Sequence, residues 1–71
     1  MIQKAINSLS DNARRYCEDI QKTLYKQSVF EKYEICNYYI NKLKGYLECL
    51  VDSGQINQSD FIVLYSFYST L

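Results

Sequence analysis

Apolar residues recur at steps of three and four along most of this 71-residue chain. Such spacing places side chains on one face of a helix and predicts an amphipathic helix rather than a strand. The first series predicts a helix over residues 2–26, with Ser8 and Ser10 as alternative N-caps if the first turn frays. It consists of Ile2, Ile6, Leu9, Ala13, Tyr16, Ile20 and Leu24.

A second and more regular series predicts a helix over residues 29–52. Its seam steps by four and three through Val29, Tyr33, Cys36, Ile40, Leu43, Leu47 and Leu50, as in a heptad repeat. Ser28 and Glu31 have the spacing of a capping box, in which each side chain bonds to the other residue's backbone amide. We therefore expect a break near Gln27. Since no Gly or Pro lies there, one continuous helix is the alternative.

The last third of the chain begins with a tight corner. Gly54 suits the left-handed backbone position that follows many helices. Asn57 and Asp60 have the spacing of a second capping box, and Ile56 and Phe61 have the spacing of a hydrophobic staple. These signals agree with one another and predict a turn between two helices.

The segment after this corner, residues 58–70, is rich in β-branched and aromatic residues, for which propensity alone favours a strand. No other segment offers a strand to pair with it. The spacing of its apolar residues also favours one helical face, formed by Phe61, Leu64, Tyr65, Tyr68 and Leu71. We predict a helix, with a strand as the alternative.

Together these elements predict an all-α fold, a small three-helix bundle of two long antiparallel helices and a shorter C-terminal helix. A chain of this length buries only about 60% of its unfolded surface, so a lone core is marginal. At about 1.5 Å per residue the third helix spans roughly 20 Å, against about 36 Å for each long one. A homodimer that completes the core is therefore a further expectation.

The composition argues against catalysis and metal binding. The chain has no histidine, the usual base at neutral pH. Its cysteines, Cys17, Cys36 and Cys49, have no C-x-x-C spacing, so they do not resemble a zinc site. We expect reduced, mostly buried thiols. The prediction is a protein that is not an enzyme and needs no cofactor or metal.

The chain also lacks the sequence signs of export and of a membrane span. Its start is polar rather than a secretory signal, and no apolar run approaches the roughly 20 residues that cross a bilayer. We expect a cytoplasmic protein without a membrane partner. Frequent Tyr, Ile, Asn and Lys, with little Ala and no Pro, are typical of AT-rich genomes such as those of low-GC bacteria and their phages.

The main functional hypothesis is based on the tyrosines. Of eight tyrosines, Tyr25 and Tyr38 lie off the apolar stripes, and exposed tyrosine is enriched at protein interfaces. Tyr38 shares the outer face of the second helix with Asn41, Lys42 and Gly45, and the glycine would admit a closely packed partner. These five residues are the predicted interface, with scattered surface tyrosines as the alternative.

The predicted function is a small regulator or inhibitor that binds another protein. Phages and mobile elements encode proteins of this size and composition, for example inhibitors of a host defence complex. The alternative is a small dimeric nucleic-acid-associated regulator that uses a basic face on the first helix, formed by Arg14, Arg15, Lys22 and Lys26. Against nucleic acid stand the net charge of zero and the acidic residues that alternate with these bases.

Overall fold

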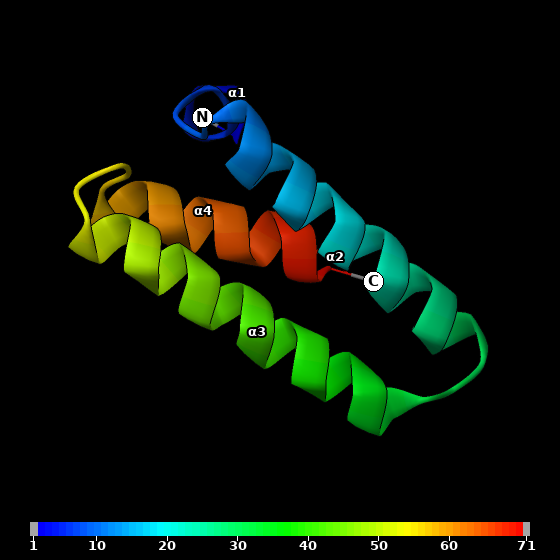
Figure 1. The fold of residues 1–71 in the computed structure, drawn as a ribbon. Coiled ribbons are helices and arrows are strands. Elements are labelled where there is room, and N and C mark those ends of the chain that lie inside the picture. Colours follow the sequence, from blue (N-terminus) through cyan, green and yellow to red (C-terminus); the bar gives the residue numbers. More distant parts are fainter. Residues whose placement is uncertain (1, 71) are drawn as a thin grey trace.

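The computed structural model describes residues 2–70 and contains four α-helices in that range. They are α1 (Ile2–Asn7), α2 (Asp11–Val29), α3 (Tyr33–Asp52) and α4 (Gln58–Ser69). Helices α2 and α3 form an antiparallel hairpin, α4 packs against both, and α1 packs against α4 (Figure 1). The predicted all-α class is confirmed, and the segment after the corner is a helix rather than a strand.

The predicted first helix, residues 2–26, is two helices. The backbone of Ser10 is extended (φ −65°, ψ 164°), and its hydroxyl accepts a hydrogen bond of 3.1 Å from the Ala13 amide. This is the geometry of an N-cap, which satisfies one of the free amides at the start of α2. The chain bends before Ser10, and α1 lies on α4 instead of continuing the axis of α2. The serine cap therefore outweighs the continuous apolar spacing.

The predicted break near Gln27, between the first and second predicted helices, is confirmed, which excludes one continuous helix, but its cap was predicted wrongly. Helix α2 continues through Val29, and the Ser28 hydroxyl donates to the Tyr25 carbonyl (2.8 Å) inside the helix. Glu31 adopts a left-handed backbone (φ 58°). Lys32 takes the N-cap position of α3, and no side chain of the described residues caps that helix.

The corner between α3 and α4 follows the prediction closely. Gly54 is left-handed (φ 79°). Its amide donates to the Val51 carbonyl (3.0 Å), and the Gln55 amide donates to the Leu50 carbonyl (2.9 Å). This pair of bonds is a Schellman motif, which satisfies carbonyls at the end of α3.

The predicted second capping box is also present. The Asp60 amide donates to Asn57 Oδ1 (2.8 Å), and the Asn57 amide donates to Asp60 Oδ2 (3.5 Å). Ile56 is buried, and Phe61 packs against the core as a hydrophobic staple requires. This corner therefore fixes where α4 begins and the direction in which it leaves the hairpin.

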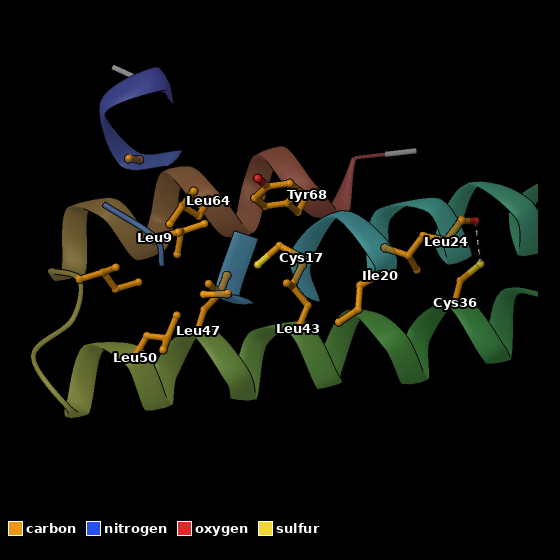
Figure 2. Close-up of a cluster of buried hydrophobic side chains, with 13 residues drawn as sticks. Leu9, Cys17, Ile20, Leu24, Cys36, Leu43, Leu47, Leu50, Leu64 and Tyr68 are labelled. Carbon is orange, nitrogen blue, oxygen red and sulfur yellow. Dashed lines mark hydrogen bonds between the residues drawn. The ribbon is translucent and has the colours of Figure 1, made fainter. Parts of the chain in front are cut away.

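The core lies between α2, α3 and α4, with Leu9 and Ala5 closing the end near α1 (Figure 2). Its other buried side chains are Ala13, Cys17, Ile20, Leu24, Cys36, Leu43, Leu47, Leu50, Ile56, Leu64 and Tyr68. Leu71, predicted on the buried face of α4, lies outside the described residues. None of the described helices combines the length and the apolar content needed to cross a bilayer.

Two residues of the apolar seam predicted for residues 29–52 do not reach the core. Val29 and Tyr33 are 60% and 58% exposed, whereas the rest of the seam is buried or half-buried. The reason is the short reach of α4, whose last turn lies beside Gln21, where Gln21 Nε2 donates to the Phe67 carbonyl (3.3 Å). Beyond that point the hairpin of α2 and α3 continues without a third helix (Figure 1).

Candidate protein-binding surface

Four of the five predicted interface residues come together on α3. Tyr38, Asn41, Lys42 and Gly45 are all exposed, and their spacing places them on the side of the helix that faces away from the core. We call this set the α3 outer face. Tyr25, the fifth residue, is exposed on α2 instead.

The aromatic part of the α3 outer face is held in place by its neighbours. The rings of Tyr38 and Tyr39 meet edge to face, with centroids 5.2 Å apart, and Tyr39 packs against the core. Lys42 Nζ lies 6.0 Å from the centre of the Tyr38 ring and 5.8 Å from that of Tyr39, within the range of a cation–π contact. Tyr38 is nevertheless 61% exposed, so it presents an ordered aromatic surface to solvent.

Gly45 has no role in the packing of the described chain. It lies exposed in the middle of α3, and a Cβ atom added there would meet no described atom within 4 Å. The predicted close approach of another backbone therefore does not occur between described parts of this chain. Glycine in the middle of a helix costs about 1 kcal/mol relative to alanine. Gly45 therefore lowers the stability of α3 at a position where the packing of the described chain does not require a small residue.

A second exposed apolar group, absent from the sequence-based prediction, lies where α2 meets α3. We call it the hairpin end, and it consists of Val29, Phe30, Tyr33 and Ile35, which are 39–63% exposed. Heptad spacing had assigned Val29 and Tyr33 to the core. The sequence did contain a signal for this exposure, namely the difference in length between the predicted helices, because a short third helix must leave one end of the hairpin uncovered.

The predicted basic face is smaller than expected. Arg15, Lys22 and Lys26 are exposed on one side of α2, but Arg14 lies on a different side and is half-buried. Its Nη2 is 3.0 Å from Asp11 Oδ1, an exposed ion pair. Exposed acids, Glu18 and Asp19, interleave with the three cations on the same helix.

The three cysteines are free thiols that differ in burial. Cys17 and Cys36 are buried as expected, and the Cys36 thiol donates to the Leu24 carbonyl (3.8 Å). Cys49 is exposed, contrary to the general expectation of burial. Within residues 2–70 no group of three or more Cys, Asp or Glu side chains is arranged to hold a metal ion.

Burial of Cys17 predicts a loss of stability in alkali. Desolvation, with a smaller effect of Glu18, raises the pKa of this thiol from 9.0 to about 11, and burial also raises the pKa of Tyr46 and Tyr68. Between pH 9 and 11 the unfolded chain releases a proton that the folded chain retains, so the free energy of unfolding falls as pH rises. Urea denaturation across this range measures the slope.

A pair of cysteine variants isolates the thiol responsible. Cys17→Ala should make the alkaline slope shallower, with the tyrosines supplying the remainder, and Cys49→Ser is the matched control that removes an exposed thiol instead of the buried one. An unaltered slope in Cys17→Ala would show that this thiol does not control the pH dependence.

The chain matches no protein-family model, and it has no significant match among curated proteins or solved structures.

Proposed function

We propose that this protein is a small non-enzymatic regulator or inhibitor that binds another protein through the α3 outer face. The observation that carries the proposal is Gly45, an exposed glycine in the middle of a helix with open space around it. Alanine would make the isolated helix more stable. A partner that packs closely against the α3 backbone explains why glycine is suitable at this position, because any larger side chain would hold the partner away.

The residues around Gly45 have the chemistry of a binding site for a helix or an extended segment. Tyr38 offers a large apolar ring whose ordering costs little entropy, since its neighbours already restrain it. Asn41 offers both a hydrogen-bond donor and an acceptor, and Lys42 adds a positive charge that selects for an acidic group on the partner. Spacings of three, four and seven residues are those with which one helix face contacts a groove.

The proposal extends to the biological setting. The amino-acid usage, with abundant Tyr, Ile, Asn and Lys and no Pro, supports an origin in a phage or mobile element of an AT-rich host. To inhibit a host defence complex, such a protein needs only to occupy a surface of that complex, and this requires no catalytic group.

Two substitutions on the α3 outer face should separate binding from folding. Tyr38→Ala should weaken capture of the partner from an extract of the native host at least tenfold, while the thermal midpoint stays nearly unchanged. Gly45→Gln should abolish capture and yet raise the midpoint by about 3–6 °C, because glutamine is the better helix former. Quantitative pull-down and thermal unfolding followed by circular dichroism measure the two effects.

Ile62→Ala is the matched control, because Ile62 is 57% exposed on α4 and lies outside the proposed surface. Capture that survives both α3 substitutions would overturn the proposal. Binding to DNA or RNA that weakens steeply with added salt, and that is lost when Arg15, Lys22 and Lys26 become glutamine, would instead support the nucleic-acid alternative.

A further inference from the structure

The turn between α2 and α3 has the backbone bonds of a Schellman motif but the wrong residue at its left-handed position. The Glu31 amide donates to the Ser28 carbonyl (3.0 Å), and the Lys32 amide donates to the Gln27 carbonyl (2.9 Å). Only Phe30, Glu31 and Lys32 separate the two helices. Glu31 takes the left-handed backbone (φ 58°) that disfavours residues with a Cβ atom, whereas the corner at the other end of α3 places Gly54 at the equivalent conformation. No side chain of residues 2–70 caps the first amides of α3.

Within the described chain, one buried polar atom near this turn lacks a hydrogen bond, and three apolar side chains lack a packing partner. Gln27 Oε1 is buried and has no hydrogen-bond partner within residues 2–70, an arrangement that is uncommon in folded proteins. The hairpin end leaves Val29, Phe30 and Tyr33 between 58% and 63% exposed. A conformation of the same segment that relaxed Glu31 and covered the three apolar side chains would be more favourable.

We propose that two copies of this chain exchange their α3–α4 units by straightening the turn, which gives a domain-swapped dimer. In each chain α2 and α3 become one long helix, and α3–α4 of one copy pack on α1–α2 of the other. Residues 26–36 contain no Gly or Pro that would oppose this. Straightening releases Glu31 from its left-handed conformation and gives the first amides of α3 helical carbonyl partners.

A second copy fits this role better than another protein does. It supplies the same core residues that the hairpin now uses, so the packing of Leu24, Cys36 and Leu43 is re-formed between chains rather than lost. The straight helix extends the α3 seam by Val29 and Tyr33, at steps of four and three. Because the two hinges of a swapped dimer lie side by side, these apolar residues bury one another.

The charges near the hinge are compatible with this pairing. Lys26, Glu31, Lys32 and Glu34 are all exposed, and because two bases balance two acids, this segment has no net charge to oppose the pairing of two copies. Simple contact between two folded hairpin ends would bury the same apolar groups but would leave Glu31 left-handed. The proposal does not depend on the α3 outer face, which stays on the surface in either form.

Two substitutions of Glu31 test the proposal in opposite directions. Glu31→Gly removes the strain from the turn and weakens the straight helix, so it should lower the dimer association constant about a hundredfold. Glu31→Ala keeps the strain and favours the helix, so it should raise the constant about threefold. Protein refolded over a range of concentrations and analysed by light scattering after size exclusion gives these constants.

The distance between residues 18 and 44 of one chain identifies the form of the dimer. Fluorophores introduced there as unnatural amino acids, in a chain diluted with unlabelled protein, should lie roughly 10–20 Å apart in the hairpin and about 39 Å apart in the swapped dimer. Monomers at all concentrations in all three proteins, or a dimer that retains the short distance, would overturn the proposal.

Discussion

Replacement of Leu43 by alanine is expected to lower the free energy of unfolding by about 3–4 kcal/mol. Leu43 is fully buried in the middle of α3, within the core cluster, so its removal leaves a cavity that helices fixed by their neighbours cannot easily close. A domain of this length has only about 4–10 kcal/mol of stability in total. Urea denaturation followed by circular dichroism should show that half of the variant protein is unfolded at a urea concentration close to zero.

Ile62→Ala provides the matched comparison, since it also removes most of an aliphatic side chain from a helix. Ile62 is 57% exposed, so its substitution should cost less than about 1 kcal/mol. Equal effects of the two substitutions would mean that Leu43 does not lie in a packed core.

Tyr68→Ala should have the second large effect, a loss of about 3–5 kcal/mol. Tyr68 is 1% exposed and lies over Cys17 where α4 meets α2 (Figure 2). Because α4 carries only two fully buried side chains, Leu64 and Tyr68, loss of this ring should release the last turns of α4 from the hairpin. Hydrogen exchange of the α4 amides measures the release directly.

The conservative variant Tyr68→Phe separates the ring from its hydroxyl. It keeps the buried aromatic surface, so we expect a change of less than about 1.5 kcal/mol and normal exchange of the α4 amides. Similar losses in both variants would assign the stability to the hydroxyl and contradict the packing argument.

The parts of the fold that the sequence predicted well are those in which several local signals coincide. Gly54, the Asn57–Asp60 box and the Ile56–Phe61 pair all indicate the same corner, and the structure contains each of them. At Ser28 a single capping signal stood alone, and it was wrong because the helix continued past it. Apolar spacing likewise joined α1 to α2, although Ser10 separates them.

The candidate site could be predicted only in part, for a physical reason. Spacing along one helix determines which residues share a face, so the grouping of Tyr38, Asn41, Lys42 and Gly45 was accessible from the sequence. Exposure of Val29 and Tyr33 depends on where α4 ends in space. That is a tertiary property, and the periodicity of α3 carries no information about it.

The two corners of α3 give the molecule a gradient of local stability. Both corners have the backbone bonds of a Schellman motif. At one end Gly54 takes the left-handed position and a capping box starts the next helix, whereas at the other Glu31 takes that position and the next helix starts without a side-chain cap from the described residues. Segments with few buried contacts and unsatisfied backbone groups are the first to open under native conditions. Transient opening of this protein should therefore begin at residues 29–33 and spread toward the core, so the order in which parts of the chain unfold is set by its turns.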